Sequence, residues 1–250
     1  MSASSSSTPA SRGASHPGIA ELRRALRALA NKDDAQFLQR FFKTGPGQYA
    51  EGDRFLGVRV PATRAVARAG RGIPHAKLLP LLRSRWHEER LLALILLTEA
   101  HARSDEKTRQ SILREYLANT RYVNNWDLVD TSAPGIVGPH VDPQRPALLE
   151  RLARSPSLWE RRIAIVATLH LIRLGELDAT FSIATLLRDD KHDLIHKATG
   201  WMLREAGKKD RAALERFLAQ HCRTMPRTML RYAIELFPAT VRKRYLADTA

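Results

Sequence analysis

The stretch IAELRRALRALA, Ile19–Ala30, carries the pattern on which the fold prediction rests. Its large apolar residues recur every three or four positions: Ile19, Leu22, Leu26 and Leu29. This spacing places side chains on one face of an α-helix. We therefore expect an amphipathic helix here, and much of the remaining chain repeats the same period.

The helical period recurs in nine further stretches: AKLLPLLRSR, EERLLALILLTEAHAR, RQSILREYLA, RPALLERLAR, RRIAIVATLHLIRL, DATFSIATLL, LIHKATGWMLREAG, AALERFLAQHC and TMLRYAIELF. Breaks such as Gly138–Pro139 and Pro226 separate them, and no alternating run typical of a β-strand occurs. One irregular segment, TGPGQYAEGDRFLGVRVP from Thr44 to Pro61, holds four glycines. We expect it to be a loop between helices.

Many short amphipathic helices joined by short breaks indicate stacked helical pairs. The predicted fold class is therefore all-α, as an α-solenoid of HEAT-like helical repeats. A compact all-α bundle is the alternative, because the repeats share no clean consensus. We expect residues 18–250 to form a single helical-repeat domain. Residues 1–17 are Ser-rich and predict a disordered tail without the apolar core of a secretory signal.

Composition narrows the class of protein. In 250 residues with 44% hydrophobic content, no run approaches the roughly 18 apolar residues of a membrane span. The single cysteine, Cys222, excludes an internal disulfide and a Cys-based zinc cluster, and fits a cytoplasmic protein. The formal net charge of +15, with 32 Arg and 9 Lys, favours nucleic acid as the partner. A GC-rich genome would explain Arg over Lys, but not the positive excess.

The charge is unevenly distributed. Residues 1–100 hold 16 basic and 8 acidic side chains, and residues 188–250 hold 14 and 8. The intervening residues 101–187 are almost balanced, with 11 and 10. Two basic flanks around a nearly neutral middle would hold a long polyanion at both ends and leave the middle for another task.

The balanced middle contains YVNNWDLVD, Tyr122–Asp130. On a helix, Trp126 and Asp130 lie on one face, one turn apart. The stretch LWERR pairs Trp159 with two arginines, of which Arg162 is the second. These spacings call for comparison with the length of one helical repeat.

Trp159 follows Trp126 by 33 positions, and Trp201 follows Arg162 by 39. A HEAT-type helical pair has about 40 residues, so side chains one repeat apart tend to share a side of the solenoid. We therefore expect one concave surface to carry four residues: Trp126, Asp130, Arg162 and Trp201.

Each of these residues also has a structural explanation. A tryptophan at helical spacing commonly belongs to the core. Asp130 precedes Thr131 and Ser132, so it could cap a following helix. Arg162 could form a salt bridge between repeats. The functional interpretation rests on the convergence of the four.

Three separated motifs resemble one known family. NNWDLVD, LWERRIAI and KATGWMLRE, in this order, are similar to AlkD-type DNA glycosylases of alkylation repair. RFLGVRVPATRAVAR also resembles that family's early loop and helix. The resemblance spans residues 20–237. The insertion TGPGQYAEGD is longer than in the shortest members, and no site residue is transferred from it.

The resemblance implies a HEAT-like solenoid that wraps duplex DNA and removes alkylated purines such as 3-methyladenine and 7-methylguanine. It implies that Asp130 is the catalytic carboxylate and that Trp126, Trp201 and Arg162 complete the lesion-side site. It also implies that the lesion can stay stacked. Further basic residues are expected to bind the DNA backbone: Arg161, Arg204, Lys208 and Lys209.

These residue types suit that chemistry. Alkylation at N3 or N7 makes a purine cationic, so it leaves without protonation. The positive charge that develops on the deoxyribose needs a nearby carboxylate, which Asp130 would supply while orienting a water. Trp126 and Trp201 would offer electron-rich faces to the cation, and Arg162 would hold a phosphate.

Other signals favour no cofactor and no metal. His192 and His196 stand four apart, but the Glu that metalloproteases place after the first His is Asp193 here. No phosphate-binding glycine loop of Walker or Rossmann form occurs. We expect a monomeric, monofunctional glycosylase in the cytoplasm, at the nucleoid. The rival hypotheses are a non-catalytic DNA-binding solenoid, for which Asp130 has no use, and a protein-binding HEAT scaffold.

Overall fold

The computed structural model describes residues 17–247, so the predicted tail, residues 1–17, lies outside the described residues except for Pro17. Within this range the chain is all-α, and its β-type pairing is a single bridge between Arg54 and Trp86. The α-helices are α1 Ile19–Arg27, α2 Lys32–Phe41, α3 Val60–Ala69, α4 Leu79–Leu82, α5 His87–Arg103, α6 Glu106–Ala118, α7 Trp126–Ile136, α8 Ala147–Ala153, α9 Leu158–Ala167, α10 Leu169–Leu174, α11 Asp178–Leu186, α12 Asp193–Lys209, α13 Arg211–His221, α14 Arg227–Ala233 and α15 Ala239–Ala247. The 3₁₀ helices are η1 His75–Leu78, η2 Thr120–Tyr122 and η3 Gly138–His140.

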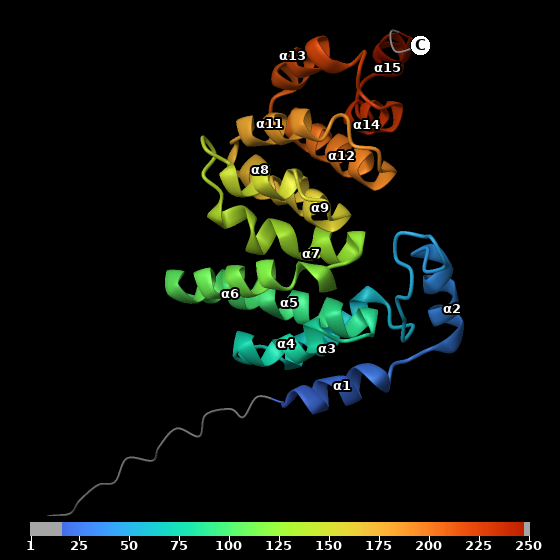
Figure 1. Ribbon diagram of the computed structural model, residues 1–250, viewed down its shortest axis with the longest axis vertical. Coiled ribbons are helices and arrows are strands. Elements are labelled where there is room, and N and C mark those ends of the chain that lie inside the picture. The colour runs from blue at the N-terminus through green and yellow to red at the C-terminus, as the bar shows by residue number, and fades with distance from the viewer. Residues whose placement is uncertain (1–16, 248–250) are drawn as a thin grey trace, which may run out of the picture.

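The helices stack in chain order. Figure 1 shows α1 at one end of an elongated stack and α13–α15 at the other, with α2 standing to one side of the layers. Along the stack, α5 packs on α7, α7 on α9, α9 on α12 and α12 on α14. The predicted α-solenoid of helical repeats is confirmed, and the compact bundle is not the arrangement found.

Helix α2 is an element that the apolar period did not predict. It has no buried residue. Its start is marked instead by Asn31, whose side chain accepts hydrogen bonds from the backbone N–H groups of Asp33 and Asp34, at 2.9 and 3.0 Å. The predicted loop follows α2, but it ends at Arg59, because α3 begins one residue before Pro61.

Gly57 brings this loop against α2. Its φ of +83° is favourable for glycine alone, and a Cβ there would lie 2.0 Å from the carbonyl oxygen of Asn31 and 2.7 Å from the amide nitrogen of Ala35. The backbone N–H groups of residues 56–58 donate to the buried carboxylate of Glu88, at 2.8 to 3.2 Å. The segment is therefore fixed to the start of α5.

Several predicted helices are shorter than their apolar stretches. The stretch RRIAIVATLHLIRL divides between α9 and α10 at Thr168, whose hydroxyl donates to the carbonyl of Ile165 at 2.7 Å. The stretch AKLLPLLRSR forms only η1 and α4. Of the helices in the described range, none combines the length and apolar character that crossing a membrane requires.

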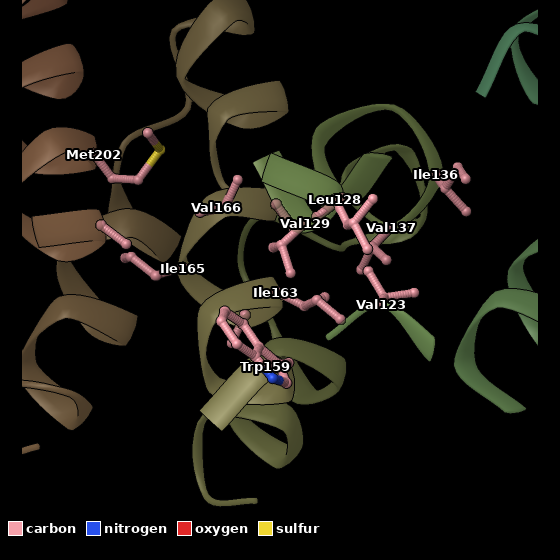
Figure 2. Close-up of a cluster of buried hydrophobic side chains, with 14 of the residues drawn as sticks. Val123, Leu128, Val129, Ile136, Val137, Trp159, Ile163, Ile165, Val166 and Met202 are labelled. Atoms are coloured by element: carbon pink, nitrogen blue, oxygen red, sulfur yellow. The ribbon is translucent and has the colours of Figure 1, made fainter. Parts of the chain in front are cut away.

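The core beneath the motif residues is formed by α7, α9 and α12. Figure 2 shows α9 between the other two: Ile163 points toward the α7 side, where Val129 lies, and Ile165 points toward Met202 of α12. These four side chains are fully buried. At about 25 cal/mol per Å² of buried apolar surface, such packing contributes several kcal/mol and fixes the polar residues on the same helices.

Candidate active site

Asp130 lies inside α7. The helix begins at Trp126, after the N-cap residue Asn125, whose side chain accepts a hydrogen bond from the Trp126 N–H at 2.8 Å. Thr131 and Ser132 continue the same helix, which even includes Pro134. The alternative that Asp130 caps a following helix is therefore wrong. Its carboxylate does not cap a helix, and a residue of another repeat binds it.

Arg162 of α9 holds the carboxylate with two hydrogen bonds. Its Nε donates to Oδ1 of Asp130 at 2.9 Å, and its Nη2 donates to Oδ2 at 2.8 Å. Its Nη1 donates to the carbonyl oxygen of Leu194 in α12, at 2.7 Å. Arg162 thus forms the salt bridge between repeats that was one of its two interpretations. The partner in that bridge is the predicted catalytic carboxylate.

The surroundings keep Asp130 partly desolvated. Its side chain is 18% exposed, and that of Arg162 is 6% exposed. Burial raises the pKa of Asp130 above its usual range, and the carboxylate of Asp127 adds to this, while Arg162 opposes both. The result is a fixed carboxylate that keeps a path to solvent.

Trp126 stands one helical turn before Asp130 and packs against aromatic rings of α2 and its C-terminal end. Its ring is stacked with Phe42, with centroids 5.2 Å apart, and meets Phe41 edge-on at 6.1 Å. Trp126 is half-buried. It is therefore supported by the core on one side and remains partly open.

Tyr49 lies beside the motif residues, although the motif spacing did not point to it. It comes from the glycine-rich loop, and its ring meets Trp159 edge-on at 6.0 Å. Burial raises the pKa of its hydroxyl; a hydrogen bond with Trp126 lowers it, and the charge of Lys197 is also felt there. The loop that supplied no transferable residue thus places a tyrosine beside Trp126. Only the three-dimensional fold reveals this, because the position has no repeat spacing.

A second acidic cluster lies beside the first. Nε2 of His87 is 2.7 Å from Oδ2 of Asp127, and its Nδ1 is 3.0 Å from Oδ2 of Asp53. Since both ring nitrogens face carboxylates, the ring is an imidazolium that donates to both. Burial alone would lower the pKa of His87, but Asp127 and Asp53 outweigh it and raise the pKa to about 9.

Trp201 lies on α12, the next layer after α9. Its Nε1 donates to Oε1 of Glu205 at 3.2 Å. Arg204 and Lys208 also donate to Glu205, at 3.2 and 2.8 Å, and Arg204 is additionally paired with Glu235. Trp201 therefore belongs to a separate polar cluster on the neighbouring helix.

Of the four motif residues, Arg162 contacts Asp130 and links α9 to α12. It touches Asp130 directly and reaches the α12 backbone at Leu194, two turns before Trp201. The described contacts include none between Trp201 and Asp130. The structure thus brings Asp130 and Arg162 into contact, places Trp126 one turn away, and sets Trp201 on the adjacent layer.

Two further predicted DNA-binding residues differ in availability. Arg161 is only 20% exposed and is held by Asp190 at 2.6 Å and by the carbonyl oxygens of Ser155 and Pro156. Lys209 is exposed, and its Nζ lies 3.4 Å from the carbonyl oxygen of Arg173. A phosphate would have to compete with Asp190 for Arg161, but not with any carboxylate among the described contacts of Lys209.

The described residues, 17–247, include no group of three or more His, Cys, Asp or Glu side chains placed to hold a metal ion. In the His192/His196 pair, whose spacing was not taken as a metal site, Nδ1 of His192 accepts a hydrogen bond from the Leu194 N–H at 3.1 Å, and His196 bonds to the Asp190 carbonyl. Cys222 is a buried free cysteine.

Comparisons with known proteins agree with this architecture. Residues 22–237 match the family model described as DNA alkylation repair enzyme. A solved structure titled as a predicted DNA alkylation repair enzyme from Enterococcus faecalis has the same fold, with a TM-score of 0.66. It is 18% identical, and the match covers 84% of this chain and 97% of the other. No curated protein matches the chain. Because the family model covers most of its length, the chain belongs to the DNA alkylation repair enzyme family.

Proposed function

We propose that this protein is an AlkD-type DNA glycosylase that excises cationic N3- and N7-alkylated purines, such as 3-methyladenine and 7-methylguanine, from duplex DNA. The observation that carries the proposal is the geometry of Asp130. It is a partly desolvated carboxylate, fixed by a bidentate arginine, with an aromatic ring one turn away in a protein of net charge +15. Membership of the family supports the same conclusion.

In this mechanism, the C1′–N bond breaks and the bonding electrons leave with the alkylated base, which loses its positive charge. The deoxyribose becomes oxocarbenium-like, and the anionic Asp130 stabilises it. Asp130 then accepts a proton from the water that attacks C1′. A carboxylate in a partly desolvated site acts more strongly on this charge than one in bulk water.

Arg162 has a double role in the proposal. Two of its N–H groups orient Asp130 and a third is bound to the Leu194 carbonyl, which leaves two of its five N–H groups for a phosphate oxygen. Trp126 and Trp201 face the cationic nucleotide with their rings. Lys197 lies near Tyr49, but its hydrogen bond to Asp193 raises its pKa, so it stays a cation and is unsuited to Schiff-base chemistry.

DNA binding is assigned to basic residues on α9 and α12: Arg161, Arg204, Lys208 and Lys209. The excess positive charge of residues 1–100 and 188–250 supports a duplex held on both flanks of the site. The proposal also comprises a single domain over residues 18–250 that acts as a monomer, without a cofactor, on cytoplasmic DNA.

The test is single-turnover release of 7-methylguanine from a defined duplex by wild type and Asp130→Asn. The substitution keeps the shape and removes the charge. We expect the release rate to fall by about a hundredfold or more, which is about 3 kcal/mol. Asp189→Asn is the matched control, since Asp189 is exposed and pairs on the surface with Arg188.

Equal release by wild type and Asp130→Asn would remove the electrostatic mechanism. No release by wild type, together with salt-sensitive DNA binding, would favour the alternative function, a non-catalytic solenoid that recognises damaged or bent DNA. Absence of DNA binding would favour a protein-binding scaffold.

A further inference from the structure

A cleft of about 620 Å³ lies between α12, α14 and α15. Figure 1 shows α14 and α15 at the end of the stack opposite α1, with α12 beside them. The charged residues of the lining come from all three helices and from the turn after α14: Arg204, Arg231, Glu235, Arg242 and Lys243. Four cations and one carboxylate give the lining a net charge of +3. A concave surface with such an excess of positive charge attracts an anionic ligand.

Three of these cations are open to a ligand. Arg231, Arg242 and Lys243 are exposed, and no carboxylate within residues 17–247 is paired with any of them. Among its described contacts, Arg242 makes one hydrogen bond, from Nη1 to the carbonyl oxygen of Glu235 at 3.2 Å. An arginine has five N–H groups, so Arg242 keeps enough of them for a bidentate contact with a phosphate.

The fourth cation, Arg204, is held by two carboxylates. It is paired with Glu235, whose side chain is 53% exposed, and its Nη2 donates to Glu205 at 3.2 Å. An ion pair with an exposed partner contributes little to stability, typically below about 1 kcal/mol, so a phosphate can take the place of Glu235. Glu205 also accepts a hydrogen bond from Trp201. The cleft is therefore connected to the tryptophan that is expected on the lesion side.

Neighbouring side chains connect the cleft with the candidate site. Tyr232 lines the cleft and lies within electrostatic range of Lys197 on α12. Lys197 is also within that range of Tyr49, which forms a hydrogen bond with Trp126. These residues lead from the turn before Asp130 to the cleft. A duplex bound at the candidate site can therefore continue along this side of the stack.

The packing order gives the distance between the two places. From the candidate site to the cleft, the helices pack in the order α7, α9, α12, α14 and α15. Packed helices lie about 8–10 Å apart, so the four steps span roughly 30–40 Å. Duplex DNA rises about 3.4 Å per base pair, so this span corresponds to about ten base pairs.

Helix α15 carries two of the exposed cations, Arg242 and Lys243, and contributes no buried residue to the core. It also lies outside residues 22–237, which match the family model. The core does not require these basic residues, and the family match does not include them. A ligand of the cleft gives them a role.

We propose that this cleft binds backbone phosphates of duplex DNA on one flank of the target nucleotide, about ten base pairs from it. Arg231, Arg242 and Lys243 contact the phosphates. A further phosphate replaces Glu235 at Arg204. This inference rests on the proposed action on DNA and adds a flanking anchor to it. Phosphate contacts of this kind position the duplex and do not read its sequence.

The test variant is Arg242→Gln/Lys243→Gln, which removes two cations from the cleft. The control variant is Arg211→Gln/Arg244→Gln, which removes two cations from a separate hollow between α13 and α15. Affinity for an undamaged duplex of about 30 base pairs is measured by gel shift at several salt concentrations. The test variant should bind at least tenfold more weakly at low salt and reduce the slope of log K against log salt by about two. The control variant should match wild type, and equal weakening by both variants would overturn the cleft as a binding site.

Glu235→Gln should act in the opposite direction, because it releases Arg204 from an internal anion. We expect affinity for the same duplex to rise at least threefold at the same salt concentration. Glu215→Gln is the matched control, since Glu215 is also partly exposed but lines the hollow between α13 and α15. An effect of Glu235→Gln no larger than that of Glu215→Gln would overturn the exchange of Glu235 for a phosphate.

The arms of the duplex locate the cleft along the DNA. Release of 7-methylguanine is measured from a duplex with about 15 base pairs on each side of the lesion, and from two duplexes with one arm cut to about five. With both arms long, the test variant should need at least tenfold more protein than wild type to reach half of its maximal rate. Cutting one arm should remove this difference, and cutting the other should leave it. A difference that survives both cuts would overturn the flanking position.

The two proposals fail in different ways. Excision by wild type, with DNA affinity that the test variant and the control variant change equally, overturns the cleft and keeps the glycosylase. DNA affinity that only the test variant weakens, in a protein that releases no base, keeps the cleft and overturns the glycosylase.

Discussion

Asp127 and Asp130 stand three residues apart on α7, yet their carboxylates are placed for different purposes. Asp130 is held by an arginine of the next repeat. Asp127 is held by an imidazolium that also binds Asp53, and the His87 and Asp53 side chains are each 2% exposed. Arginine keeps its charge at every relevant pH, whereas the imidazolium does not. The Asp130 pair therefore keeps its cation at every relevant pH, whereas the His87 cluster loses its cation as the pH rises.

The largest expected effect comes from removing the cation beside Asp130. Arg162→Ala leaves a partly buried carboxylate without a partner, and such a loss typically costs about 3–5 kcal/mol. We expect the free energy of unfolding, from urea titration, to decrease by an amount near the lower end of that range. The reason is that Asp130 keeps 18% of its side chain exposed, so water partly compensates for the lost partner. Excision should fall as well, because the loss of Arg162 raises the pKa of Asp130 further.

The double variant Arg162→Ala/Asp130→Asn tests the cause. With no charge left to desolvate, it should recover a large part of the stability lost in Arg162→Ala, although not the activity. If the double variant is less stable than Arg162→Ala by the full cost of a second independent change, the pair is not coupled. Asp130 would then not depend on Arg162 as Asp127 depends on His87.

The His87 cluster should make stability depend on alkaline pH. The pKa of His87 is about 9 in the folded protein against 6.5 unfolded, so its contribution is complete below pH 6.5 and is lost as pH rises through about 9. A difference of this size corresponds to roughly 3 kcal/mol. We expect wild-type stability, from urea titration between pH 6 and 10, to decline across this window.

His87→Gln is the matched variant, because its amide can still reach one carboxylate but does not titrate. It should be less stable than wild type at pH 6 and show a much flatter profile up to pH 9. A wild-type profile as flat as that of the variant would show that Asp127 and Asp53 do not hold an imidazolium. Arg162→Ala, by contrast, should retain the alkaline decline.

Asp130 should limit excision on the acid side. Its pKa is raised by burial, so the anion needed for catalysis is lost at a higher pH than for an ordinary aspartate. Below that pKa the single-turnover rate should fall about tenfold per pH unit. Rates measured on pre-alkylated duplex across pH 4 to 8 report this limb. The residual rate of Asp130→Asn should lack it, and a matching limb in that variant would assign the titration to another group.

Much of the solenoid could be predicted from apolar spacing, because helices with a buried face carry it in their sequence. Helix α2 buries no residue, and its start is marked by the Asn31 cap and not by a buried face. The division between α9 and α10 falls at Thr168, whose side chain bonds to the Ile165 carbonyl, and apolar spacing does not record such a bond.

In the candidate site, too, spacing predicts some residues and not others. Asp130 and Arg162 are related by repeat spacing, and they meet in space. Tyr49, His87 and Asp53 lie on a loop and on an earlier helix, so no periodicity links them to α7. Their contacts depend on how the loop folds back over Gly57. The contribution of a non-repeating insertion to a repeat protein is therefore the part that spacing does not predict.

The smallest expected effect is on the salt dependence of DNA binding and concerns two adjacent lysines on α12. One of them is paired with a carboxylate and the other is not. Lys208 is bound to both carboxylate oxygens of Glu205 at 2.8 Å, whereas Lys209 approaches only a carbonyl oxygen. A lysine that already has a carboxylate partner gains less from a phosphate. Lys209→Gln should therefore reduce the slope of log K against log salt by about one, and Lys208→Gln by less. Gel shifts of undamaged duplex at several salt concentrations measure both slopes. If Lys208→Gln has the larger effect, DNA displaces Glu205 from Lys208, and the polar cluster around Trp201 rearranges on binding.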